Sequence, residues 1–165
     1  MKIMIFTEGT ILMARGAVGH TREEIVVQVK NKEASVKEYG SYIPIKNAVS
    51  KIKKWVDQGA EIVYLTSRRN LKEVGEIKEV LRRNMFLVGT LEYRKGLEEY
   101  KDVAERVMPD ILVEDDCESI GGEKEMTYPH IGESKRQRIR SVVVKEFGGI
   151  DELPDNIDLL KTVTQ

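Results

Sequence analysis

Three acidic residues, Glu114, Asp115 and Asp116, stand together directly after the apolar run 111–113. Neighbouring carboxylates repel one another, so such a cluster is costly unless a cation or a basic partner compensates the charge. Carboxylate oxygens are ligands that Mg²⁺ prefers, with water and phosphate completing its coordination. The cluster therefore predicts a Mg²⁺ site. The alternative is an acidic loop that is exposed to water.

A second group of polar residues, Thr66, Ser67 and Arg68, follows the apolar run 61–65. The guanidinium of Arg68 is suited to a bidentate, charge-assisted contact with a phosphate. Thr66 or Ser67 can instead cap the N-terminus of a helix. The two interpretations are compatible, because a helix N-terminus itself attracts anions. We therefore expect this stretch to bind an anion.

The N-terminal apolar run 1–6 leads into Thr7, Glu8, Gly9 and Thr10. A glycine at this place lets the backbone turn sharply and present N–H groups to an anion. Gly9 is therefore a candidate phosphate-binding residue. The alternative is an ordinary turn from a strand into a loop.

Short β-branched runs alternate along the chain with longer amphipathic runs. This pattern is typical of an α/β fold, a three-layer sandwich in which helices cover both faces of a mostly parallel sheet of about five strands. Ligands bind beyond the carboxyl ends of the strands in such sheets, so the three polar groups are expected to share one site. The pattern predicts strands at residues 2–6, 61–66, 86–93, 110–114 and 141–146, and helices at 48–58, 71–83 and 97–107.

The order of these strand-end groups resembles the phosphate-handling site of the haloacid dehalogenase superfamily, whose members are mostly Mg²⁺-dependent phosphatases. That family opens with Asp-x-Asp-Gly-Thr, and its first Asp attacks phosphorus. Here Phe6 stands in the first position, or Thr7 if one residue is deleted. Phe cannot attack phosphorus, and a Thr hydroxyl needs a base to activate it. Glu8 matches the second Asp, which is the family's general acid and base, but its side chain is one methylene longer.

The resemblance also assigns roles to the other groups. It implies that Thr66 hydrogen-bonds a phosphate oxygen and that Asp115 and Asp116 hold Mg²⁺. It implies that Lys101, in the helical stretch before the acidic cluster, neutralises the phosphate. Lys95 competes for this last role, and the alternative for Lys101 is a solvated surface lysine.

A chain of 165 residues is most simply a single domain, residues 1–165. Residues 11–45, here called the insertion segment, separate the first strand from the first helix that packs on the sheet. The resemblance implies that this segment is a small cap or flap over the site. Thr21 and Glu24 have the spacing of a capping box, which predicts the start of a helix. Residues 25–29 could equally form a strand.

The net charge is −1 although 33% of the residues are charged, so no overall field draws the protein to nucleic acid or to a membrane. The basic segment 135–140 has no interleaved aromatic residues and is expected to be solvated. Cys117 is the single cysteine, and the N-terminal apolar run is too short for a signal peptide or a membrane span. These features predict a cytoplasmic protein. Cys117 is expected to be a poor thiolate beside three acids, and a lone histidine such as His130 is more often structural than functional.

Two functions follow from this pattern. The first is a Mg²⁺-dependent phosphohydrolase of a small phosphorylated metabolite or nucleotide, in which Thr7 or a metal-positioned water replaces the missing Asp. The second is a non-catalytic relative that binds a phosphorylated ligand or a protein partner, since phosphomonoester hydrolysis can need up to about 10²¹-fold acceleration. A third possibility is a receiver-like regulatory domain, because such domains also combine acids, a Thr or Ser and a Lys at strand ends. Their acidic pair normally follows the first strand.

Overall fold

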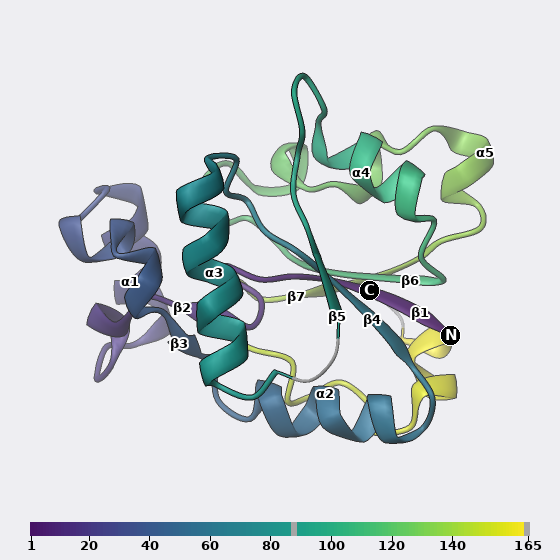
Figure 1. Cartoon of the computed structure of the whole chain (residues 1–165), viewed down its shortest axis with the longest axis horizontal. Helices are drawn as coiled ribbons and strands as arrows, with labels where there is room; N and C mark the ends of the chain where they lie inside the picture. Colours follow the sequence, from purple (N-terminus) through teal and green to yellow (C-terminus); the bar gives the residue numbers. More distant parts are fainter. Residues whose placement is uncertain (87–88, 164–165) are drawn as a thin grey trace.

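The fold is built around one parallel sheet. The computed structural model describes residues 1–86 and 89–163. The five-stranded sheet has the order β5-β4-β1-β6-β7 and all its pairs are parallel (Figure 1). The strands are β1 (Lys2–Phe6), β4 (Glu61–Leu65), β5 (Gly89–Glu92), β6 (Ile111–Asp115) and β7 (Arg140–Val144). This confirms the predicted α/β sandwich, although residues 87–88 of the predicted strand 86–93 lie outside the described residues.

The strands alternate their side chains between two buried layers, as expected for a sheet that is covered on both faces. In β1, Ile3 and Ile5 join a core with helices α2 (Ala48–Asp57) and α3 (Leu71–Arg83). Met4 points to the opposite face and joins a second core with α4 (Tyr100–Val107). A single turn of helix, α5 (Glu133–Arg136), lies on the same side as α4 (Figure 1). Because β1 is central, its carboxyl end lies between those of β4 and β6.

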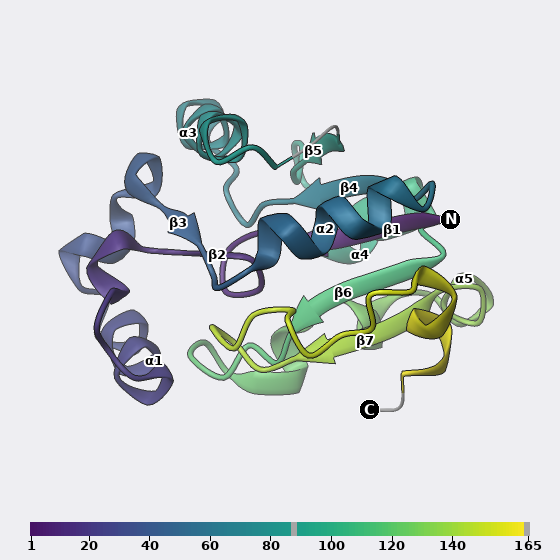
Figure 2. The same ribbon diagram turned by 90° about the horizontal axis from the view of Figure 1, so that it is seen from below.

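The insertion segment forms a small unit of its own beside the carboxyl ends of the strands (Figures 1 and 2). It contains α1 (Arg22–Lys30) and an antiparallel pair of short strands, β2 (Leu12–Met13) and β3 (Ile43–Pro44). The helix begins after Thr21, and both hydrogen bonds of its capping box with Glu24 are present. The helix predicted from this box is therefore confirmed, and the alternative strand at 25–29 is not formed.

The start of α3 differs from one of the sequence-based alternatives. Its N-cap is Asn70, whose side chain accepts a hydrogen bond from the N–H of Lys72. Thr66 and Ser67 therefore do not cap this helix, since a loop separates them from it. Leu71 fits the apolar periodicity of the helix but is 71% exposed, because it lies in the first turn, beyond the edge of the core.

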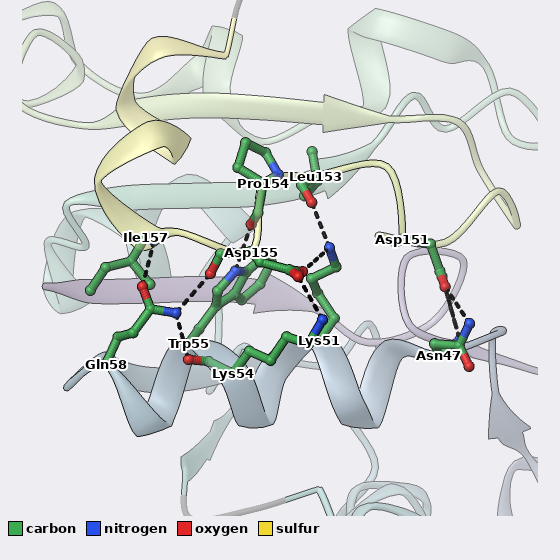
Figure 3. A network of polar contacts seen from close by, with 10 residues as sticks. All are labelled: Asn47, Lys51, Lys54, Trp55, Gln58, Asp151, Leu153, Pro154, Asp155 and Ile157. Carbon is green, nitrogen blue, oxygen red and sulfur yellow. Dashed lines mark hydrogen bonds and ion pairs between the residues drawn. The ribbon is translucent and has the colours of Figure 1, made fainter.

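The segment after β7 holds α2 against the sheet through a set of polar contacts that we call the α2 clamp (Figure 3). The buried Lys51 ammonium lies 2.6 Å from a carboxylate oxygen of Asp155 and donates to the carbonyl of Leu153, also at 2.6 Å. Trp55 Nε1 donates to the carbonyl of Pro154 at 2.9 Å. The clamp thus gives a partner to both buried polar groups of α2, the Lys51 ammonium and the Trp55 indole N–H.

The chain then ends in a short 3₁₀ helix, Ile157–Thr162, whose Leu160 is fully buried in the first core. This agrees with the short helix predicted near residues 157–163. None of the helices in the described ranges has the length and apolar character needed to cross a membrane.

Candidate functional site

A cavity of about 280 Å³ lies at the carboxyl ends of the central strands. Phe6 at the end of β1, Ser67 after β4 and Asp115 at the end of β6 all line it. Other walls come from the insertion segment and from the loops after β6 and β7. The sheet therefore brings the predicted strand-end groups to one place, as its topology requires. We call this space the site cavity.

One carboxylate, that of Glu8, already occupies the anion-binding groups that the sequence suggested for phosphate. Thr66 Oγ1 donates to Glu8 Oε1 at 2.7 Å, and the backbone N–H of Ser67 donates to Oε2 at 3.1 Å. Arg68 Nε lies 3.4 Å from Oε1. Hydroxyl, amide and guanidinium groups thus converge on a single anion. The arrangement is suited to a phosphate oxygen once Glu8 moves aside.

Two arginines border the cavity, and each is held by a tyrosine ring. The guanidinium carbon of Arg68 lies 4.3 Å from the ring centroid of Tyr39, and that of Arg94 lies 4.0 Å from the centroid of Tyr100. Stacking of this kind contributes about 0.5–2 kcal/mol and fixes the direction of the charge. Arg94 also donates from Nη2 to the carbonyl of Ser67 at 3.2 Å.

Arg94 is a residue that the sequence reasoning missed. Within the described part of the chain, its Nε is buried and has no hydrogen-bond partner. An unpaired buried donor is costly and calls for a ligand or water to satisfy it. Arg94 follows β5 in the same way that Arg68 follows β4, so the rule of looking beyond strand ends could have found it.

A carboxylate cluster formed by Asp115, Asp116 and Glu146 lies beside the cavity. One carboxylate oxygen from each residue lies within 4.8 Å of the others. Glu146 was also missed, although it closely follows the last strand, β7. Its oxygens accept hydrogen bonds from the backbone N–H and the hydroxyl of Ser119, both at 2.6 Å.

The three acids of this cluster titrate differently. Burial, and then the charge of Glu146, raise the pKa of Asp115 to about 7, while a hydrogen bond from Thr10 at 2.8 Å opposes the shift. Burial likewise raises the pKa of Glu146. Burial would raise the pKa of Asp116 as well, but the ammonium of Lys145 at 2.9 Å and the N–H of Glu146 at 3.1 Å together hold that pKa below its usual range.

The cluster fits a divalent cation by its chemistry. All its donors are carboxylate oxygens, which Mg²⁺ prefers. Within the described residues, Asp115 and Glu146 form no ion pair, so part of the negative charge of the cluster is uncompensated. Gly9 has no side chain and can therefore lie close to the carboxylate of Asp115. A Cβ at this position would lie only 2.8 Å from Asp115 Oδ2.

Glu114, the first acid of the predicted cluster, lies apart from the other two. Its buried carboxylate accepts hydrogen bonds from the backbone N–H groups of Thr127 at 2.7 Å and Tyr128 at 3.0 Å. Burial raises the pKa of Glu114. The residue anchors the loop that follows β6 and so shapes one wall of the cavity.

The loop after β1 places its residues differently from the sequence-based expectation. Thr7 is fully buried, and its hydroxyl lies 2.5 Å from Glu8 Oε2 and 3.2 Å from the carbonyl of Leu65. Phe6 lines the cavity instead and packs edge-on against Tyr100. The N–H of Gly9 donates to Leu12, and its carbonyl accepts from the N–H of Phe147 at 2.7 Å.

Lys101 points away from the groups described so far. Its ammonium pairs with Glu99 at 3.1 Å, and this hydrogen bond raises the pKa of the lysine. Among the described residues that line the site cavity, the cations are Arg68 and Arg94, not Lys101 or Lys95. Lys101 is the second residue of α4, and its side chain leaves the helix on a face other than that of Tyr100.

The contacts of Cys117 and His130 fit residues with a structural role. Burial, followed by the neighbouring acids, raises the pKa of the Cys117 thiol, as expected for a poor thiolate. His130 is exposed and its Nε2 lies 2.8 Å from the carbonyl of Lys124. Neither observation gives these residues a chemical role.

Comparison with known proteins yields little. None of the family models matches the chain, and none of the curated proteins does. Among solved structures, the chain is similar to a D,D-heptose 1,7-bisphosphate phosphatase from Burkholderia thailandensis, with 11% sequence identity, a TM-score of 0.44, and coverage of 88% of this chain and 92% of that one. A likeness this distant decides nothing about activity. Membership of the haloacid dehalogenase superfamily therefore stays a prediction.

Proposed function

We propose that this protein binds a small phosphorylated molecule together with Mg²⁺ in the site cavity. The observation that carries the proposal is the convergence of Thr66 Oγ1, the Ser67 N–H and Arg68 on one carboxylate, that of Glu8. These donors form an anion site, and Arg94 adds a buried donor that lacks a partner among the described residues. In the proposal, a phosphate displaces the Glu8 carboxylate and pairs with these groups.

In this proposal Asp115, Asp116 and Glu146 hold the cation. Their oxygens lie within 4.8 Å of one another, and Asp115 and Glu146 line the same cavity. A bound Mg²⁺ would neutralise phosphate charge and polarise the phosphorus–oxygen bonds. Lys145 stays paired with Asp116 and limits the net charge of the cluster.

A second candidate function is hydrolysis of the bound phosphoester. It is favoured by the position of Glu8 on the wall of the cavity, where a carboxylate released from Thr66 and Ser67 can accept or deliver a proton. A covalent phosphoenzyme is not supported, because Phe6 occupies the expected nucleophile position and the Thr7 hydroxyl is turned into the protein. Binding without turnover is therefore the function that the geometry supports best.

The proposal is tested by calorimetric titration with methylphosphonate, which keeps the phosphate-like head group and cannot be hydrolysed. We expect Mg²⁺-dependent binding that is weakened about tenfold or more in Arg68→Gln, since one charge-assisted contact is lost. Arg69→Gln is the matched control, because the Arg69 guanidinium donates to the carbonyl of Gly96 instead. Equal weakening in both variants, or no binding by the wild-type protein, would overturn the proposal.

The same protein preparation decides between binding and hydrolysis. Phosphate release from a panel of phosphomonoesters is followed with Mg²⁺ present and with Mg²⁺ chelated. Release that needs Mg²⁺ and disappears in Glu8→Gln would establish the hydrolase. Saturable binding without release would establish the binding protein.

A further inference from the structure

The wall that the insertion segment contributes to the site cavity is apolar. Its side chains that face the cavity come from the stretch between β1 and α1, from α1 itself and from the two 3₁₀ turns that follow. Figure 2 shows this segment standing beside the carboxyl end of the sheet, where the strands terminate. The apolar members of this wall are Ala14, Ala17, Ile25, Val29 and Val36.

The polar groups of the same wall are almost all engaged within the protein. The hydroxyl oxygen of Tyr39 accepts a hydrogen bond from the guanidinium of Arg68, and the hydroxyl of Tyr42 donates to the carbonyl of Val36 at 2.7 Å. Of the residues that line this wall, only Gln28 keeps a side-chain amide that no described contact uses. A ligand rich in hydroxyls would bury most of them here without a partner, which is unfavourable.

The rest of the lining carries further apolar side chains, those of Phe6, Tyr100, Ile120 and Phe147. It also includes polar residues, among them Thr127, whose buried hydroxyl has no partner among the described residues. The cavity of about 280 Å³ lies just below the range of roughly 300–1,000 Å³ that is usual for small-molecule sites. Its lining thus combines the charged groups Arg68 and Arg94 with the apolar wall of the insertion segment, and it has space for a ligand of modest size.

We propose that the ligand is an aryl phosphomonoester, a phosphate that carries one aromatic ring, and not a sugar phosphate. This inference rests on the proposed function, because it uses the same phosphate-binding groups. The ring would lie against Val29, Val36 and the neighbouring apolar side chains, while Arg68 and Arg94 hold the phosphate. Aromatic rings bury a large apolar area for their size, which suits a small apolar chamber.

The inference is tested by titrating the Mg²⁺-loaded protein with phenylphosphonate, methylphosphonate and ribose 5-phosphate. We expect phenylphosphonate to bind about tenfold or more tighter than methylphosphonate, because only the ring buries apolar surface. Ribose 5-phosphate should bind no tighter than methylphosphonate. If ribose 5-phosphate binds as tightly as phenylphosphonate, the inference fails and the proposed function stands. If none of the three binds, both fail.

A pair of valines on α1 provides the matched variants. Val29 lines the cavity, whereas Val27 lies outside it and is 50% exposed. We expect Val29→Asn to reduce the preference for phenylphosphonate over methylphosphonate about tenfold and Val27→Asn to leave that ratio unchanged. An unchanged ratio in Val29→Asn would show that the ring lies elsewhere.

Discussion

The α2 clamp and the site cavity both bury charged groups, but they treat those charges in opposite ways. In the clamp, the Lys51 ammonium has an ion pair with Asp155 and a carbonyl acceptor. In the site, Asp115 has no ion pair within the described residues and Arg94 Nε has no acceptor there. A compensated buried charge costs the fold little, whereas an uncompensated one costs stability and leaves groups ready for a ligand.

The largest effect is expected when the uncompensated charge of Asp115 is removed. Asp115→Asn should stabilise the metal-free protein by on the order of 2–3 kcal/mol at pH 8, since the pKa raised to about 7 reports an unfavourable carboxylate. The same change should abolish measurable Mg²⁺ binding. Urea unfolding in the presence of a chelator and titration with Mg²⁺ check the two effects.

Asp116→Asn is the matched control for this variant. The pKa of Asp116 is held low, because Lys145 and the N–H of Glu146 together outweigh the effect of burial. Its replacement should therefore weaken Mg²⁺ binding without any gain in stability. A comparable stabilisation in both variants would mean that the cluster is not strained by charge at Asp115.

The next largest effect is expected when the compensating contacts of Lys51 are removed. Lys51→Ala should destabilise the protein by about 2 kcal/mol, because it removes a buried donor that serves both Asp155 and the Leu153 carbonyl. Lys53→Ala on the same helix should change stability by no more than about 0.5 kcal/mol, since the Lys53–Asp57 pair is exposed. Thermal unfolding measures both. Equal losses of stability in the two variants would indicate that the polar contacts of Lys51 add nothing to the effect of replacing a lysine on this helix.

A smaller effect concerns pH. Because protons compete with the cation for Asp115, Mg²⁺ affinity should fall by up to about tenfold for each pH unit below 7 and level off above it. The metal-free protein should behave in the opposite sense: the folded state holds the Asp115 proton longer than the unfolded state, so stability falls as pH rises from about 4 to 7. Calorimetric titrations and unfolding curves between pH 5 and 8.5 measure the two trends. An affinity that is flat across this range would separate Asp115 from the cation site.

The smallest effect probes the internal anion. Glu8→Gln should raise the affinity for methylphosphonate about fivefold, because the ligand no longer displaces a charged carboxylate from Thr66 and Ser67. Fold stability, followed by circular dichroism, serves as the control. A weaker affinity would show that Glu8 belongs to the binding groups and does not compete with the ligand.

The sequence predicted the sheet well because apolar periodicity and parallel topology depend on local pattern. It also indicated Glu8, Thr66 and Asp115 as strand-end groups, and the structure brings them to one rim. It did not indicate that Glu8 turns its carboxylate onto Thr66, because side-chain direction depends on contacts between distant segments.

Other misses have the same physical origin. Arg94 and Glu146 follow strands β5 and β7 without a recognisable motif. A search beyond every strand end would name them as candidates, but the assembled sheet is needed to show that they reach the site. Lys101 has a suitable position along the chain, but the helical repeat directs its ammonium to Glu99. Spacing in sequence predicts which face of a helix a residue occupies, but not which neighbouring group its side chain contacts.

The hydrogen bond from the Phe147 N–H to the carbonyl of Gly9 joins the loop that carries Glu8 to the segment that carries Glu146. Moving the two loops apart would lengthen this bond. The amide proton of Phe147 is thus a natural spectroscopic sensor: its exchange with deuterium reports how firmly the two loops stay docked, from a backbone atom that no phosphate or cation needs to touch.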